Sequence, residues 1–154
     1  MDEIYRLGTG DVVKVTVFGE ENLSGEFTVD DAGAISMPLI GPVEAANKTP
    51  RELAASVTAR LKNGYLRNPR VSTQIVGYRP FYIYGEVQEP GNYPFTLGLN
   101  VIEAVATAGG YTYRADQDEV YITRKVDGES QQFSAPPGAR VFPGDIIKVP
   151  ERYF

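Results

Sequence analysis

The stretch that most constrains the fold is residues 81–110, which read FYIYGEVQEPGNYPFTLGLNVIEAVATAGG. Its first residues alternate between two sets of side chains, the period-2 pattern of a strand with two different faces. Pro90-Gly91 favours a turn after this strand. Residues 93–95 indicate a short second strand, which we expect at a sheet edge because a proline cannot donate a ladder hydrogen bond. Asn100, with Glu103 three residues later as in a capping box, is placed to cap a helix that ends at Gly109-Gly110. A hairpin followed at once by a helix is the opening of a β-grasp unit.

The segment that follows is expected to complete the sheet of this unit. Three runs with strand-like composition predict its further strands: residues 120–124, 131–134 and 144–150. Asp127-Gly128 supplies a hairpin turn between the first two runs. The hydrophobic pattern resets at Tyr78-Arg79-Pro80, where a proline interrupts it. We therefore predict two domains, residues 1–77 and 78–154.

The first of these domains has the pattern of a small α+β unit. Alternating valines or helix-capping signals predict its most regular elements: strands over residues 11–18 and 71–76, and a helix from Thr49 to Gly64. Phe27 and Val29 are predicted to pair with residues 35–39 across a turn at residues 30–33, in which Gly33 takes the left-handed conformation. The predicted fold class is thus α+β: a small domain of β-hairpin, helix and strand, followed by a ubiquitin-like β-grasp domain.

A short repeat occurs in both domains, as GDVVKV at residues 10–15 and GDIIKV at residues 144–149. A turn glycine, an aspartate that accepts hydrogen bonds from nearby backbone amides, and a β-branched run account for both copies. We expect the repeat to mark the start of a strand and not a shared ligand site.

The composition excludes several classes of function. The chain has 15 Lys and Arg against 20 Asp and Glu, a net charge of −5, and no basic cluster, so nucleic acid is not expected as a partner. It has no cysteine and no histidine, which removes thiolate chemistry and the commonest general base. The acidic residues around the turn at residues 30–33 lack the spacing of a calcium loop. Without a nucleophile elbow or a recognisable carboxylate pair, we predict no enzyme, no catalytic residues, no metal and no cofactor.

Motifs along nearly the whole chain carry a resemblance to a known family. In the first domain they are YRLGTGD at residues 5–11, VFGE at 17–20, PLIGPV at 38–43 and NP at 68–69. In the second they are GEV at residues 85–87, PG at 90–91, AGG at 108–110 and PGD at 143–145. In this order they resemble the bacterial polysaccharide-export (outer-membrane auxiliary) proteins, in which an export domain precedes a soluble-ligand-binding β-grasp (SLBB) domain.

The resemblance implies a periplasmic component of capsule or exopolysaccharide export that forms a homo-oligomeric ring and conducts polysaccharide toward the outer membrane. Family members of this kind work with an inner-membrane polysaccharide co-polymerase. This sequence shows no signal segment, no cysteine for lipidation, one β-grasp domain and no C-terminal amphipathic helix. We therefore expect a processed or trimmed chain, in the periplasm or associated with the outer membrane, that needs a separate outer-membrane pore.

Eight of the ten tyrosines lie from Tyr78 onward, and aromatic rings serve both packing and recognition. We interpret Tyr82, Tyr84 and Tyr121, which fall in predicted strands, as sheet-packing or subunit-interface residues. The better candidates for contact with other subunits or with glycan lie in predicted loops: Tyr78, Arg79, Tyr111, Tyr113 and Arg114.

Two other functions fit the same sequence. One is a monomeric β-grasp module that binds a soluble glycan or small ligand at one concave site. The other is a cytosolic interaction domain that pairs a sheet edge with a partner strand. A ring transporter should self-associate, whereas a binding module should remain a monomer.

Overall fold

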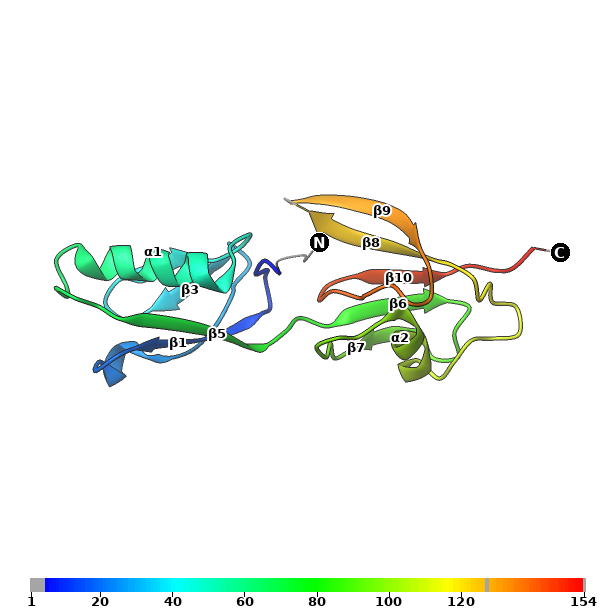
Figure 1. The fold of residues 1–154 in the computed structure, drawn as a ribbon, viewed down its shortest axis with the longest axis horizontal. Coiled ribbons are helices and arrows are strands. Elements are labelled where there is room, and N and C mark those ends of the chain that lie inside the picture. Colours follow the sequence, from blue (N-terminus) through cyan, green and yellow to red (C-terminus); the bar gives the residue numbers. More distant parts are fainter. Residues whose placement is uncertain (1–4, 127, 154) are drawn as a thin grey trace. The chain divides into compact units, whose positions relative to one another are not determined.

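The computed structural model describes residues 5–126 and 128–153 (Figure 1). The chain divides into two compact units, an N-terminal unit that ends at Tyr78 and a C-terminal unit that begins at Arg79. Over the described residues each unit combines one α-helix with several short strands, so the predicted α+β class is confirmed. Asp127, half of the turn predicted at Asp127-Gly128, lies outside the described residues.

In the N-terminal unit, β1 (Val12–Val17) is the central strand of an antiparallel sheet, between β2 (Gly25–Thr28) and β5 (Val71–Gly77). Alternate side chains of a strand face opposite ways, and the three valines at positions 13, 15 and 17 are buried in the core. The remaining elements are the 3₁₀ helix η1 (Glu21–Leu23), the hairpin of β3 (Ala34–Met37) and β4 (Gly41–Glu44), and the helix α1 (Pro50–Lys62).

The strand pairing predicted across the turn at residues 30–33 is wrong. β2 pairs with β1, and β3 pairs with β4 in a separate two-stranded sheet. The left-handed conformation predicted for Gly33 is confirmed, with φ +79°. Its carbonyl accepts hydrogen bonds from the amides of Ala45 and Ala46, each at 2.8 Å. Because these bonds hold the turn against the segment after β4, the chain leaves the turn beside β4 and not beside β2.

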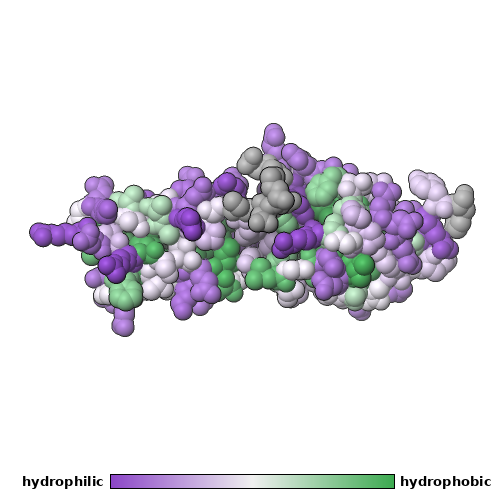
Figure 2. Space-filling model, in the orientation of Figure 1, coloured by the Kyte–Doolittle hydropathy of each residue, from purple (hydrophilic) through white to green (hydrophobic). Residues whose placement is uncertain are grey.

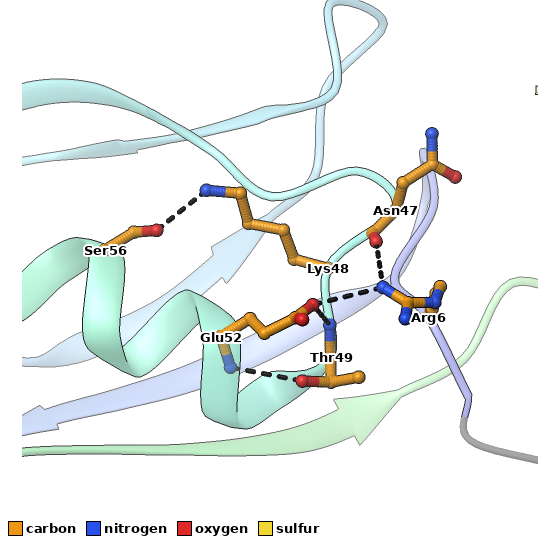
Figure 3. Close-up of polar contacts among 6 residues, drawn as sticks. All are labelled: Arg6, Asn47, Lys48, Thr49, Glu52 and Ser56. Carbon is orange, nitrogen blue, oxygen red and sulfur yellow. Dashed lines mark hydrogen bonds and ion pairs between the residues drawn. The ribbon is translucent and has the colours of Figure 1, made fainter. Parts of the chain in front are cut away.

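Helix α1 begins with a capping box, which confirms the helix start predicted at Thr49 (Figure 3). The Thr49 hydroxyl accepts a hydrogen bond from the Glu52 amide at 3.1 Å, and the Glu52 carboxylate accepts one from the Thr49 amide at 3.0 Å. Arg6 donates to the same carboxylate at 3.1 Å and to the Asn47 carbonyl at 2.7 Å. The Thr49 amide, and then the charge of Arg6, lower the pKa of Glu52. The buried stripe of the helix is Leu53, Val57 and Leu61.

The sheet of the C-terminal unit has the strand order β7-β6-β10-β8-β9. Its strands β6 (Phe81–Gly85) and β10 (Ile146–Val149) are parallel. The strands β7 (Gly91–Tyr93), β8 (Val120–Val126) and β9 (Glu129–Ala135) complete it in antiparallel pairs. Counted along the chain from β6, this is the order 2-1-5-3-4 of a ubiquitin-like β-grasp. The predicted β-grasp architecture is therefore confirmed.

Helix α2 (Val101–Thr107) covers one face of this sheet. Its predicted capping box is confirmed, since the Asn100 side chain accepts from the Glu103 amide at 2.9 Å and the Glu103 carboxylate from the Asn100 amide at 3.0 Å. The second strand lies at the sheet edge as predicted, but it ends at Tyr93 instead of continuing through residues 93–95. Phe95 is instead partly buried against the core. That core includes Phe81, Ile83, Val101, Ala104, Val105, Ile122 and Ile147.

The two copies of the short repeat form the same local structure. Asp11 accepts a hydrogen bond from the Gly8 amide at 2.9 Å, and Asp145 accepts one from the Phe142 amide at 2.7 Å. In each copy the aspartate amide also donates back to the carbonyl of that same partner, at 3.1 and 3.0 Å. Each buried aspartate thus closes a turn immediately before a strand, β1 or β10. The prediction that the repeat marks the start of a strand is confirmed.

Candidate functional site

One face of the C-terminal sheet packs on α2, and the side chains on the opposite face are directed to solvent. In β6, Phe81 and Ile83 are buried, so the intervening Tyr82 and Tyr84 point the other way. The ladder register extends this second face across the neighbouring strands. We call it the open face, and its strand positions are Asn92, Tyr82, Tyr84, Ile146, Lys148, Tyr121, Thr123, Lys125, Ser130, Gln132 and Ser134.

Aromatic and cationic side chains lie side by side in one row of the open face. Lys148 of the middle strand is in register with Tyr84 on one side and with Tyr121 on the other. Neighbouring strands lie about 4.8 Å apart, so Lys148 separates two tyrosine backbones that are roughly 9.6 Å apart. Tyr84 is 45% exposed and Lys148 is exposed. The interpretation of Tyr82, Tyr84 and Tyr121 as sheet-packing or interface residues remains a prediction, and the structure places them on this solvent-directed face.

The charge of the open face differs from that of the whole chain. Among the strand positions that define the face, Lys148 and Lys125 are cationic and none is acidic, although the chain carries a net charge of −5. The other polar positions carry amides or hydroxyls, which both donate and accept hydrogen bonds. Hydrophilic side chains cover most of the molecular face drawn in Figure 2, with smaller apolar areas between them. The open face can therefore offer ring stacking, hydrogen bonds and positive charge together.

Two of the predicted loop residues, Tyr113 and Arg114, lie together at a second place in the C-terminal unit. With Glu151 and Arg152 they line a hollow of about 290 Å³. The Arg114 Nε donates to the Tyr113 hydroxyl at 3.2 Å, and the Arg114 carbonyl accepts from the Arg152 amide at 2.9 Å. Tyr113 is 76% exposed. This hollow presents two guanidinium groups, one carboxylate and an accessible ring to a ligand or a neighbouring subunit.

Tyr111, the third predicted loop residue, does not line the hollow. It forms an isolated β-bridge with Val87, and its ring packs partly buried against the core. Burial raises the pKa of the Tyr111 phenol, and the negative charges of Asp116 and Asp118 raise it further. These contacts indicate that Tyr111 holds the loop to the sheet.

The other two predicted site residues are each engaged within their own unit. The ring of Tyr78 packs edge-on against Tyr5, with centroids 5.5 Å apart. Burial, and then the charge of Asp11, raises the pKa of the Tyr78 phenol. Arg79 lies against Gly144, where a side chain on residue 144 would collide with the Arg79 Nε. Of the five predicted residues, the structure brings only Tyr113 and Arg114 together in one hollow.

A buried ion pair in the C-terminal unit has a structural explanation. The guanidinium of Arg124 donates from Nε to one oxygen of Asp145 at 2.9 Å and from Nη2 to the other at 2.8 Å. Nη2 also donates to the Arg140 carbonyl at 3.3 Å, and Cζ lies 4.0 Å from the centre of the Phe142 ring and 5.1 Å from that of Phe133. The pair therefore ties the turn before β10 to β8.

Within residues 5–126 and 128–153 there is no group of three or more Asp, Glu, Cys or His side chains placed to hold a metal ion. Among the same residues, no helix is long and apolar enough to cross a membrane.

Sequence reasoning missed Lys148, Glu151 and Arg152 as site residues. In the last strand, Lys148 alternates with the buried Ile147 and Val149, so its side chain points to the other face of the sheet. Its exposure could therefore have been predicted from the sequence. Its position between Tyr84 and Tyr121 could not, because it depends on the register of three strands that are distant in sequence. The arginines of the hollow likewise meet only through the bridge between Ala115 and Glu151.

Comparison with protein families assigns both parts of the chain. Residues 2–76 match the family model described as polysaccharide biosynthesis/export protein, and residues 80–134 match that of the SLBB domain. The chain belongs to the bacterial polysaccharide-export protein family.

Curated relatives of the chain agree with the family assignment. The exopolysaccharide production protein ExoF of Rhizobium meliloti is 35% identical over 139 residues, which are 82% of this chain and 33% of ExoF. The EPS I polysaccharide export outer membrane protein EpsA of Ralstonia nicotianae is 25% identical over 96% of this chain and 48% of its own length. The polysialic acid transport protein KpsD of Escherichia coli is 32% identical over 69% of this chain and 19% of its own length. The chain thus spans less than half the length of each of these relatives, of which EpsA is named for polysaccharide export and KpsD for polysialic acid transport.

Proposed function

We propose that this chain is a periplasmic component of a capsule or exopolysaccharide export system and that it acts as a homo-oligomeric ring around the path of the polymer. The observation that carries the proposal is the ordered match of both family models, which together cover most of the chain. The relatives named as an outer-membrane export protein and a transport protein support the location at or near the outer membrane. No catalytic group is needed for conduction.

The two units take separate roles in this proposal. Residues 1–77 are the export domain and residues 78–154 are the SLBB β-grasp domain, in keeping with the division at Tyr78 and Arg79. The partners are an inner-membrane polysaccharide co-polymerase, a separate outer-membrane pore and the polysaccharide itself. Tyr113 and Arg114, which are accessible at the hollow, are the residues proposed to contact a neighbouring subunit or the glycan.

The native mass of the chain tests the ring. Multi-angle light scattering would be recorded over a range of concentrations, with and without the periplasmic domain of the co-polymerase. We expect a defined oligomer, either alone or on addition of the partner. We expect Tyr113→Ala and Arg114→Ala to shift the equilibrium toward monomer, and Tyr65→Ala, an exposed tyrosine of the N-terminal unit, to leave it unchanged. A monomer under every condition contradicts the ring.

The open face favours one alternative, a monomeric SLBB module that binds a soluble glycan or small ligand. Exposed tyrosines beside amides and hydroxyls suit such a ligand without any second subunit. This alternative predicts a monomer in the scattering experiment together with saturable binding of an oligosaccharide.

A further inference from the structure

We propose that the open face binds a segment of acidic polysaccharide, with Tyr84 and Tyr121 stacking on sugar rings and Lys148 pairing with a carboxylate between them. This inference rests on the proposed function in polysaccharide export and assigns the class of polymer. It also assigns the contact to strands of the SLBB sheet, and not to the loop residues predicted from the sequence.

The spacing of the row suits an extended polymer. Tyr84 and Tyr121 are on strands that flank the strand of Lys148, so the three side chains stand in a line across the sheet. The faces of aromatic rings offer apolar contact to the C–H groups of a sugar, and the tyrosine hydroxyl retains a hydrogen-bonding end. A roughly 9.6 Å separation of the two tyrosine backbones is a span that a short stretch of linked sugar rings can bridge. The ammonium group between them reaches a substituent on those rings.

The neighbouring row supplies hydrogen bonds on the same face. Asn92 of the edge strand β7 pairs with Tyr82 of β6, and Gln132 of the other edge strand, β9, pairs with Thr123 of β8. An amide side chain therefore stands at each end of this row. Amides and hydroxyls recognise sugar hydroxyls because each can donate and accept. Ligand sites combine aromatic or apolar side chains with a few placed polar groups, and the open face carries both kinds.

The charge distribution favours an acidic polymer over a neutral one. Lys148 and Lys125 are exposed on the face, and its strand positions include no carboxylate. The chain as a whole is acidic, with net charge −5, so other surfaces repel a polyanion. A locally cationic strip on an acidic protein therefore guides a polyanion to one face.

The same composition argues against a protein partner on this face. The buried centre of a protein–protein interface is depleted in lysine and other charged residues. Here a lysine is at the centre of the row, and Ile146 is the only aliphatic side chain among the strand positions of the open face. Burying Lys148 against a second copy of the chain would desolvate its charge without a carboxylate on the same face to pair with it.

Titration calorimetry of the full chain with two oligosaccharides tests the proposal. The probe is an α-1,4-linked oligogalacturonate, and the uncharged control is a malto-oligosaccharide of the same linkage and length. We expect saturable binding of the oligogalacturonate that weakens with added salt, and several-fold weaker binding of the control that does not depend on salt. Tyr84→Ala should weaken binding about tenfold through loss of stacking. Lys148→Ala should weaken it about fivefold at low salt and leave little difference at high salt.

Two substitutions in the N-terminal unit provide matched controls. Tyr65 is 48% exposed, against 45% for Tyr84, and Lys14 is exposed on a strand as Lys148 is. Tyr65→Ala and Lys14→Ala should leave the affinity unchanged. Three results would overturn the proposal. The first is a control variant that weakens glycan binding as much as its partner on the open face, the second is equal affinity for the charged and the uncharged oligosaccharide, and the third is no binding of the oligogalacturonate at all.

Native mass measured on the same variants separates this inference from the ring. If Tyr84→Ala and Lys148→Ala break the oligomer and do not alter glycan affinity, the open face is a subunit interface, which overturns the inference but leaves the ring standing. If the chain is a monomer and these two variants lose glycan binding, the ring fails and the inference is supported.

Discussion

The ion pair between Arg124 and Asp145 provides the sharpest test of what holds the C-terminal unit together. Replacing Arg124 with Met keeps the unbranched stem of the side chain and removes the guanidinium group with its charge. The Asp145 carboxylate, whose side chain is 1% exposed, then keeps the Phe142 amide at 2.7 Å but loses both guanidinium bonds. A buried carboxylate without its counter-charge is strongly unfavourable.

The expected loss can be compared with the stability of the unit. Removing one partner of a buried ion pair lowers the free energy of unfolding by about 3–5 kcal/mol. Because the Arg124 side chain is 16% exposed, water can partly solvate the site, and we expect about 3 kcal/mol, the lower end of that range. A unit of this size has a free energy of unfolding of roughly 4–11 kcal/mol. Arg124→Met should therefore leave the unit folded, with a free energy of unfolding of roughly 1–8 kcal/mol.

Urea unfolding monitored by circular dichroism measures the decrease in the free energy of unfolding. Hydrogen exchange shows whether the destabilised residues lie within 79–153. Lys125→Met is the control, because it removes a charge from the next residue of β8, which is exposed. We expect it to change the free energy of unfolding by less than about 0.5 kcal/mol. Adding Asp145→Asn to Arg124→Met should restore about 1–2 kcal/mol, since the unpaired charge is then gone. An Arg124→Met variant as stable as the Lys125→Met control would refute the reasoning.

Three further predictions concern the helix cap, a strained residue and an ionisable tyrosine. Thr49→Ala removes the hydroxyl that caps α1 and should lower stability by about 1 kcal/mol, with faster hydrogen exchange confined to the N-terminal unit. Leu39 has φ +76° and a 63% exposed side chain, so Leu39→Gly should raise the free energy of unfolding by about 1 kcal/mol; a loss of stability in urea would contradict strain at this position. The pKa of Tyr111 is raised above 10.0 in the folded chain, so its contribution to stability is complete below pH 10.0 and is lost as the pH rises through the folded-state value. Tyr111→Phe should make alkaline unfolding less steep, and an unchanged alkaline profile would show that another group controls it.

Local signals in the sequence were sufficient where a residue acts through its neighbours in the chain. The caps at Thr49 and Asn100 are side-chain bonds to amides three residues away, and both were predicted. The same holds for Asp11 and Asp145, whose turns close over three residues. Period-2 alternation indicated the first strand of the β-grasp sheet and strand-like composition the later ones, and the order of hairpin, helix and further strands indicated its topology.

Pairing decided by distant contacts could not be predicted in the same way. The turn at Gly33 was foreseen, but the choice of β4 over β2 as the partner of β3 depends on bonds from Ala45 and Ala46. The candidate site was only partly foreseen for the same reason. Tyr113 and Arg114 were named from their position in a loop, whereas the row of Tyr84, Lys148 and Tyr121 emerges only from the register of three strands.

The most direct test of the central claim is the amount of polysaccharide at the surface of cells that lack the gene for this chain. A role in export predicts that surface polysaccharide is lost while its synthesis continues, and that the intact gene restores it. A gene that carries the Tyr84→Ala and Lys148→Ala substitutions should restore less surface polysaccharide than the intact gene if the open face binds the polymer. Unchanged surface polysaccharide in the deletion strain, with no related gene to replace it, would contradict the account.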